Sequence, residues 1–524
     1  MKRRQFLRQT LPVALAAPFA LHGLRFSALA QTPQLRRMLS EAEQDDTVLV
    51  LIQLQGGNDG LNTVIPIDDD LYHNLRPVLR IDKKDALALD NHPLLRLHPS
   101  LGGIQRMFND GQLAIVENIG YSDYSLSHFT GTEIWNTGSG SSAQEYLATG
   151  WLARYLMQEF PHYPEVLPQD PPAIQISPTT SSVFSTSGAS MGVALTDPAT
   201  FHEMVHGGPN VPDDPRVPVT PADDELRFIQ SVNAQALGFS ASIREAALKA
   251  NNLVAYPDGN ELADALAIVA RLIAGGLQTR IYMVSIGNFD FHANQLEPHA
   301  LLLSRLGSAA KAFMDDLIAL GIDRRVVGMT YSEFGRRAMD NGSGSDHGAA
   351  APHFVFGTPV RGGIVHGGLP DLRNLDAAGN LRHAISFQCY YASVFGPLFG
   401  LPEERLQAIL PRGVCEPSDR VPIYAAPASA GPPSIGIGAA PEMSSIPNPT
   451  AGHTAIHYTT ARPGRVTITL HDIGGRHIAD LLGEYQEAGM HVARVDLTSL
   501  PAGAYLYRIN ADGTMRSGKV SVVR

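Results

Sequence analysis

The chain has 524 residues, of which 44% are hydrophobic and 17% are charged. This length exceeds what one hydrophobic core usually organises, so we expect at least two domains. The composition excludes a disordered or fibrous chain. The formal net charge is −11, and no block rich in lysine or arginine follows the first residues. Binding to nucleic acid is therefore not expected, because neutralising phosphates requires clustered cations.

Residues 1–30 have the three parts of an export signal. A positively charged start is followed by an apolar run over residues 11–24 and by the small residues Ala28-Leu29-Ala30. Because Phe6 and Leu7 follow the pair Arg3-Arg4, the segment resembles a twin-arginine signal. An ordinary secretory signal is the alternative. After cleavage no apolar stretch reaches the roughly 20 residues of a membrane-spanning helix, so we expect an exported protein without a transmembrane segment.

The chain contains two cysteines, Cys389 and Cys415. In an oxidising compartment they can pair, and two separate thiols are the equal alternative. Two cysteines alone do not build a metal site.

The C-terminal part has the pattern of a small β-sandwich. Residues 412–447 are rich in proline, alanine, glycine and serine, which indicates a linker. Beyond it, alternating segments predict strands at residues 454–459, 464–471, 491–496, 503–510 and 518–523. Turn signals separate them at the spacing of a sandwich, which we place at residues 448–524.

Five segments of this region resemble the C-terminal sorting domain of the type IX secretion system. They are residues 447–449, 466–476, 488–491, 500–505 and 507–508. The resemblance implies export by that machinery, through the periplasm to the cell surface or the extracellular space. A generic fibronectin-like or carbohydrate-binding sandwich is the alternative. The usual signal for type IX export is a general secretory peptide, so the twin-arginine start is in tension with this assignment.

The segment from residue 45 to 411 alternates strand and helix patterns. Apolar runs predict buried strands at residues 47–54, 279–286, 325–331 and 353–357. Helical periodicity covers residues 226–250, 262–277 and 298–320. This alternation predicts an α/β domain whose mainly parallel sheet is flanked by helices.

Polar residues lie at the ends of these strands, where ligands gather in such sheets. Asp59 follows the first strand, Asp290 and His292 follow the second, Glu333 follows the third, and Asp346 and His347 precede the fourth. Singly, each has an ordinary explanation such as a helix cap or a surface histidine. Carboxylates and imidazoles that converge at one edge are the ligands of a divalent metal, so together they predict a metal site.

Five motifs at these positions resemble the family called domain of unknown function 1501. They are residues 54–66, 127–129, 290–295, 332–336 and 346–348. The resemblance extends over residues of about 45 to 405 and implies the fold of the alkaline phosphatase and sulfatase clan. Members of that clan use two divalent metals and a serine, threonine or modified cysteine nucleophile.

The resemblance also implies roles for individual residues. Asp290, His292 and His347 would form one metal site, and Asp59 and Glu333 the second, with zinc as the expected ion and one or two ions bound. One departure weakens the second site, because Glu333-Phe334 stands where the clan has Asp-His. His128 is a candidate for the missing imidazole, and Asp346 is a further candidate ligand.

The nucleophile and an anion-binding residue follow from the same comparison. Ser127 would be the nucleophile at the start of a helix over residues 127–135, whose N-terminus favours an anion. Ser125 and Thr130 are the alternatives. Arg336 would stabilise the transferring group by a bidentate contact.

Residues 202–206 match the H-E-x-x-H pattern of zinc proteases. Pro198 shortly before it and Gly207 directly after it leave too short a helix for such an enzyme, so we reject a protease. The expected function is that of a secreted metal-dependent hydrolase acting on phosphate or sulfate esters. The alternative is a surface binding or assembly protein that keeps the fold without turnover.

Overall fold

The computed structural model describes residues 46–140, 147–207, 221–410, 415–424, 444–446, 450, 452–460, 464–472, 476–486, 489–511 and 514–523. The expected export signal lies outside these residues, so its twin-arginine assignment stays a prediction. The chain divides into two compact units, Met1–Ala426 and Pro427–Arg524. Across the described ranges, no helix has the length and apolar character needed to cross a bilayer.

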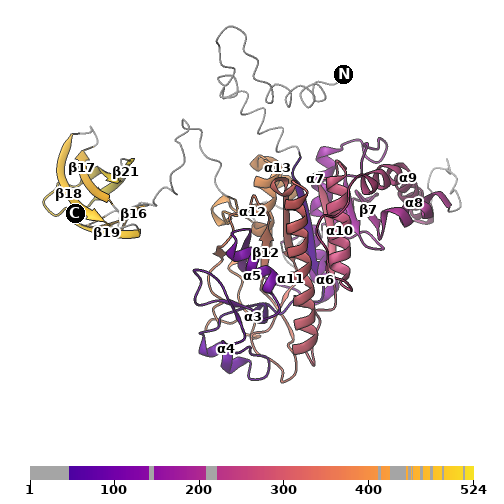
Figure 1. The fold of residues 1–524 in the computed structure, drawn as a ribbon, viewed down its shortest axis with the longest axis horizontal. Helices are drawn as coiled ribbons and strands as arrows, with labels where there is room; N and C mark the ends of the chain where they lie inside the picture. Colours follow the sequence, from indigo (N-terminus) through magenta and orange to yellow (C-terminus); the bar gives the residue numbers. More distant parts are fainter. Residues whose placement is uncertain are drawn as a thin grey trace, which may run out of the picture. The chain divides into compact units, whose positions relative to one another are not determined.

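A sheet forms the centre of the first unit, with helices around it (Figure 1). It has nine strands, in the order β13-β5-β12-β9-β1-β8-β6-β7 with β14 beside β5. Its strands are β1 (Val48–Leu54), β5 (Leu113–Gly120), β6 (Ala173–Ile176), β7 (Gly192–Leu195), β8 (Ile281–Ile286), β9 (Val326–Tyr331), β12 (Ala351–Phe356), β13 (Val365–His366) and β14 (Ile385–Ser386). Every pairing is parallel except those of β12 with β5 and β9. The mainly parallel sheet predicted from the sequence is confirmed.

Helices cover both faces of this sheet. One face packs against α5 (Gly102–Asn109), α9 (Pro221–Lys249), α10 (Glu261–Ala274) and α11 (Leu296–Ala319). The other packs against α6 (His128–Thr137), α7 (Trp151–Glu159), α12 (Phe387–Leu398) and α13 (Glu403–Ile409). Strand β1 shows why its sequence is continuously apolar: Val50 and Ile52 join the first core, whereas Leu49 and Leu51 join the second.

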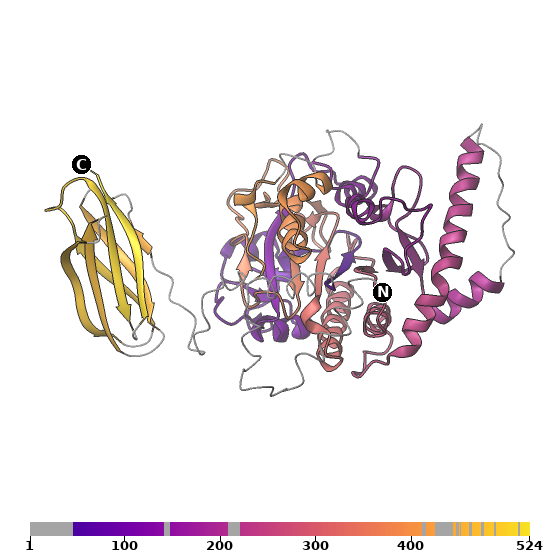
Figure 2. The same cartoon turned by 90° about the horizontal axis from the view of Figure 1, so that it is seen from above.

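Short elements complete the unit. Helix α8 (Pro198–Gly207) packs on α9, and the two appear as the magenta helices at the right of Figure 2. The remaining elements are α3 (Gly60–Thr63), α4 (Asp70–Leu75), η2 (Ser182–Phe184), η3 (Asp323–Arg325), η4 (Pro417–Asp419) and the three-stranded sheet of β2 (Val64–Ile65), β4 (Arg96–Leu97) and β3 (Leu87–Ala88). Strands β10 (Gly335–Arg336) and β11 (His347–Gly348) pair antiparallel, so Arg336 lies opposite His347. This pairing brings the loop after β9 to the loop before β12.

Residues 415–424 pack on the α/β unit, although we expected the linker to start at residue 412. Cys415 forms a disulfide with Cys389 of α12, which decides between the two alternatives left open by the sequence. Ile423 is 1% exposed, and the hydroxyl of Tyr424 donates to the carbonyl of Val394. These apolar residues anchor the segment despite its proline-rich surroundings, and the first unit therefore extends to Ala426.

The second unit contains two antiparallel sheets. One has β15 (Ser444–Ile446), β16 (His453–Thr460) and β19 (Gly489–Asp496), and the other has β18 (His477–Gln486), β17 (Gly464–Asp472), β20 (Gly503–Ala511) and β21 (Thr514–Val522). Ile456 and Val495 of the first sheet share one core with Ile468 and Tyr507 of the second, as expected of a sandwich. Strand β18 was absent from the sequence-based prediction because two register shifts against β17 interrupt its alternation.

Candidate metal centre

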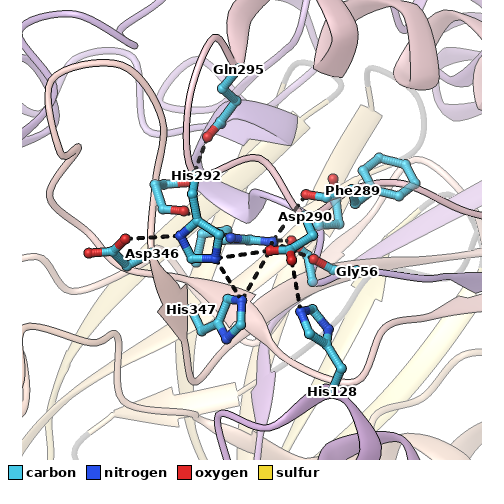
Figure 3. A network of polar contacts seen from close by, with 12 residues as sticks. Gly56, His128, Phe289, Asp290, His292, Gln295, Asp346 and His347 are labelled. Atoms are coloured by element: carbon cyan, nitrogen blue, oxygen red, sulfur yellow. Dashed lines mark hydrogen bonds and ion pairs between the residues drawn. The ribbon is translucent and has the colours of Figure 1, made fainter.

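Three imidazoles and one carboxylate meet at the carboxyl end of the central strands (Figure 3). Asp290 and His292 lie in the loop after β8, His347 lies in β11, and His128 is the first residue of α6. Because β12 runs antiparallel to β9, the loop before β12 reaches the same edge as the loops after the parallel strands. The fold thus collects groups that are distant in sequence.

The ligand atoms of these side chains are close to one another. Asp290 Oδ1 lies 3.0 Å from His347 Nε2 and 3.1 Å from His292 Nε2. Asp290 Oδ2 lies 3.2 Å from His128 Nε2, and the Nε2 atoms of His292 and His347 are 3.0 Å apart. The structure therefore brings together Asp290, His292 and His347, as the sequence predicts, and adds His128. Their role as metal ligands stays a prediction.

Each imidazole is held through its other nitrogen. The Nδ1 atoms of His128, His292 and His347 lie 2.8 Å from Glu333 Oε1, 3.0 Å from Asp346 Oδ1 and 2.7 Å from the carbonyl of Leu126, respectively. An acceptor at Nδ1 keeps the proton of a neutral ring on that atom, and the lone pair is then on Nε2. All three rings consequently direct lone pairs at Asp290 or at one another.

This arrangement fits a cation. Two lone pairs face each other between His292 and His347, and His128 Nε2 is buried without a hydrogen-bond partner. Two ligands bound about 2.1 Å from a tetrahedral ion lie about 3.4 Å apart, close to the separations observed. Imidazole nitrogens with one carboxylate suit zinc or a similar divalent ion.

The carboxylate of Asp290 is ionised and oriented by Arg336. Burial favours its neutral form, but the hydrogen bond and the charge of Arg336 hold the pKa of Asp290 well below its usual range. Arg336 Nη2 donates to Asp290 Oδ1 at 2.6 Å. The guanidinium also donates from Nε to the carbonyl of Gly57 and from Nη1 to that of Ser345. All three nitrogens are engaged and the side chain is 1% exposed, so Arg336 positions Asp290, and its bidentate contact with an anion stays a prediction.

Glu333 is buried and hydrogen-bonded to His128. Its side chain is 3% exposed, and Oε1 accepts hydrogen bonds from His128 Nδ1 and from the backbone N–H of Gly56, both at 2.8 Å. The other oxygen lies 3.3 Å from Ser332 Oγ. The hydrogen bond to Glu333 raises the pKa of His128, against the opposing effect of burial.

Asp59 is also occupied by protein groups. Arg76, which is fully buried, donates from Nη1 to both carboxylate oxygens at 2.6 and 2.8 Å, and Gln295 donates to Oδ2. Burial alone raises the pKa of Asp59, but the charge and hydrogen bond of Arg76 lower it overall. Within the described ranges no hydrogen bond or ion pair joins Asp59 to Glu333, so their role as a second metal site stays a prediction. In the same ranges the ligand atoms of His128, Asp290 and His347 all lie within 4.8 Å of one another.

Ser127 caps α6, with its hydroxyl accepting from the backbone N–H of Thr130 at 3.5 Å. Ser125 Oγ in turn accepts from the N–H of Ser127 at 3.2 Å. Within the described ranges no hydrogen bond joins Ser127 to the clustered ligands, so its role as nucleophile stays a prediction, as do those of Ser125 and Thr130.

A pocket of about 600 Å³ opens beside the cluster. Its walls come from the ends of β1 and β8, from α6, and from the segment between β6 and η2. Phe129 stands at this pocket with 91% of its surface exposed. The pocket was not predicted from the sequence, although the polar residues Gln53, Gln175 and Asn288 at these strand ends are a sign of it.

The H-E-x-x-H motif lies in α8, where the rings of His202 and His206 are 4.3 Å apart. The described part of the chain supplies no third ligand that completes a metal group with these two histidines. The helix ends at Gly207, in line with the reasons for rejecting a zinc protease.

Two regions of the chain match known families. Residues 238–383 match the family described as protein of unknown function (DUF1501), and residues 445–523 match the secretion system C-terminal sorting domain. Both resemblances seen in the sequence are thus confirmed for these residues. Asp290, His292, Glu333, Arg336 and His347 lie within the first match. The sorting domain indicates export to the cell surface or the extracellular space.

Several solved structures are similar to this chain at low sequence identity. A sulfatase from Pseudoalteromonas sp. has 9% identity and a TM-score of 0.32, covering 89% of this chain and 88% of that one. The lipoteichoic acid synthase LtaP from Listeria monocytogenes has 7% identity and a TM-score of 0.27, covering 61% of this chain and 69% of that one. The alkaline phosphatase from the Antarctic bacterium TAB5 has 10% identity and a TM-score of 0.26, covering 61% of this chain and 95% of that one. No curated protein matches this chain in sequence.

Proposed function

We propose that this protein is a secreted metal-dependent hydrolase of phosphate or sulfate esters. The observation that carries the proposal is the convergence of three imidazole Nε2 atoms on the carboxylate of Asp290. Each imidazole Nδ1 has its own acceptor, which is the support that metal-binding histidines normally have. A bound divalent ion would supply Lewis-acid stabilisation for the negative charge that develops on the ester oxygens.

The exposure of the ligands favours a reactive site over a structural one. The side chains of Asp290 and His292 are 41% and 48% exposed, whereas His347 is 19% exposed. A ligand set of His128, Asp290 and His347 leaves one position of a tetrahedron for substrate, as catalytic zinc sites do. His292, at the exposed side, is the fourth candidate ligand. We propose one zinc ion at this site and no second ion at Asp59.

The start of α6 supplies the remaining groups. His128 begins the helix and belongs to the cluster, so the N-terminus of the helix lies at the site and favours an anion. We assign the nucleophile to Ser127, the residue before His128, with Ser125 and Thr130 as alternatives. A serine hydroxyl needs activation to attack an ester, and a nearby cation or base provides it.

A non-catalytic surface binding or assembly protein is the second candidate. The occupation of Asp59 by Arg76 favours it, because a fold that lacks the second metal has lost part of the two-ion chemistry implied by the resemblance. Ester turnover discriminates the two candidates.

The test measures zinc content and hydrolysis of 4-nitrophenyl phosphate, bis(4-nitrophenyl) phosphate and 4-nitrophenyl sulfate by the full exported chain. We expect bound zinc and turnover of at least one ester, both lost in His347→Ala. Turnover should be lost in Ser127→Ala with zinc retained, and both should persist in the control His477→Ala, which alters an exposed histidine of β18. Bound zinc without turnover of any ester supports the binding protein. Absence of bound zinc from the folded wild type refutes the centre.

A further inference from the structure

The pocket beside the metal centre has uncharged polar walls. Among the lining residues that the structure describes there is no lysine or arginine. Apart from His128, Asp290 and Glu333 at the metal centre, the one ionisable lining residue is Glu133. The rest of the lining is dominated by the amides and hydroxyls of asparagine, glutamine, serine and threonine. A second phosphate or sulfate would find no cation here, and a hydrocarbon chain would leave these polar groups without partners.

The back wall of the pocket is fixed by its own hydrogen bonds. The buried amide of Gln175 accepts from the N–H of Ser181 at 2.7 Å. Asn136, which is 3% exposed, donates to the hydroxyls of Ser181 and Ser182, both at 3.1 Å. Ser182 donates to Glu133 Oε2 at 2.9 Å. These contacts order the wall before a ligand binds, which reduces the entropy lost on binding.

Other groups of the lining have unused hydrogen-bonding capacity. Thr132, Thr180 and Asn288 also line the pocket, and no hydrogen bond within the described ranges involves their side chains. Phe129 lies on the same helix face as Thr132 and leaves 91% of its surface to solvent. An exposed aromatic ring in this position does not contribute to the hydrophobic core, and it is suited to contact a ligand with an apolar face.

We propose that this pocket binds a sugar ring of the substrate, whose charged ester group lies at the metal centre. Sugar hydroxyls both donate and accept, which matches a wall of amides, hydroxyls and a single carboxylate. The C–H face of a pyranose packs on an aromatic ring, the role assigned to Phe129. The volume of about 600 Å³ is in the range of small-molecule sites. This inference rests on the proposed hydrolase for the placement of the ester, and the substrate class is then a phosphorylated or sulfated carbohydrate.

The test measures binding of neutral sugars, which need neither the ester nor turnover. Methyl glycosides of glucose, galactose, fucose, xylose and N-acetylglucosamine are titrated into the zinc-loaded full exported chain and followed by calorimetry and by ligand-observed NMR. We expect saturable binding of at least one glycoside. Phe129→Ala and Thr180→Ala should each weaken it about tenfold or more, in the range of other single contacts in a binding site. Both positions are at the surface of the pocket, so the variants should keep the thermal unfolding midpoint of the wild type.

Matched controls separate the pocket from the surface in general. Leu301→Ala removes an exposed hydrophobic residue of α11, and Thr200→Ala removes an exposed hydroxyl of α8, both outside the pocket lining. Neither should alter sugar binding. Absence of binding for every glycoside, or binding that both pocket variants retain in full, overturns the inference.

Zinc content is measured on the same samples, so that the two proposals fail separately. A chain that binds zinc but no glycoside overturns the sugar pocket and leaves the hydrolase standing. A chain that binds glycosides but no zinc overturns the metal centre and supports the pocket as a carbohydrate-binding site.

Discussion

Replacing Glu333 by glutamine should weaken zinc binding while leaving the α/β unit folded. Glutamine keeps the shape of Glu333, and its amide oxygen accepts from His128 Nδ1 and the N–H of Gly56 as the carboxylate does. The amide nitrogen of the glutamine then faces Ser332 Oγ. Because the Ser332 hydroxyl donates its proton to the carbonyl of Leu54, its oxygen can accept a hydrogen bond from this amide nitrogen. The change therefore removes the negative charge behind His128 and little else.

The expected loss of zinc affinity can be calculated from the usual contribution of a carboxylate that supports a metal-binding histidine. Loss of an outer-shell carboxylate typically weakens metal affinity 10- to 100-fold, which corresponds to about 1.4–2.7 kcal/mol. At a zinc concentration about 1,000 times the wild-type Kd, the ion stabilises the folded state by about 4.1 kcal/mol, and a 100-fold weaker site by about 1.4 kcal/mol. For a unit of about 380 residues the difference lowers the melting temperature by about 3 °C.

The assay is competition for zinc against a chromogenic chelator, together with thermal unfolding with zinc and with a chelator in excess. Asp480→Asn is the control, because Asp480 accepts from exposed His477 in the same way at 2.7 Å but lies in the second unit. We expect Glu333→Gln to lower the zinc affinity and, in the presence of zinc, the melting temperature. Without zinc all variants should have the same melting temperature, and Asp480→Asn should change neither quantity. Unchanged zinc affinity in Glu333→Gln would refute the reasoning, since Glu333 would then not support a ligand.

Three further predictions concern pH, a buried acid and the disulfide. Zinc affinity should fall as the pH is lowered toward and below about 6.5, because the hydrogen bond to Glu333 raises the pKa of His128 and its protonated ring binds no metal; an isothermal zinc titration over pH checks this, and a flat profile contradicts it. Burial raises the pKa of Glu117 to about 8 from 4.5, so the folded state holds a proton that the unfolded state releases. The stability of the wild type relative to Glu117→Gln should therefore fall between about pH 4.5 and about pH 8, by on the order of 3 kcal/mol at about pH 7, in denaturant titrations. Cys389→Ser should lower the free energy of unfolding by about 3.5 kcal/mol, because the unfolded chain is no longer restricted by the loop that the Cys389–Cys415 bridge closes. Reduction of the wild type should lower it by the same amount.

The central strands could be predicted because burial on both faces leaves a continuous apolar run, as in β1 and β9. Strand β5 is equally buried, but its polar Glu117-Asn118 pair interrupts the run, and the sequence-based prediction omitted it. Strands β6 and β7 have four residues each, too few for a clear pattern. Long helices were predicted within a few residues of their bounds, since their periodicity extends over several turns.

The site was predictable where its residues follow or precede a strand directly. Asp290, His292 and His347 meet for that reason. The partners of Asp59 and Glu333 could not be foreseen, because Arg76 reaches Asp59 from the end of α4 and His128 reaches Glu333 across 205 residues of sequence. The resemblance assigned both carboxylates to a metal, whereas buried carboxylates take whichever cation or donor the fold places beside them.

The disulfide also determines how mechanical tension enters the α/β unit. A force that pulls on the sorting domain is transmitted along the backbone to the segment of residues 415–424. Weak side-chain contacts resist first, and once they give way the covalent bond at Cys415 carries the load to α12. Residues 390–414 are then bypassed, so helix α13 and most of α12 are protected from being unravelled by the force, and the load enters the unit at Cys389, a buried residue near the start of α12. The disulfide thus gives the α/β unit a fixed anchor for the chain that leads to the sorting domain.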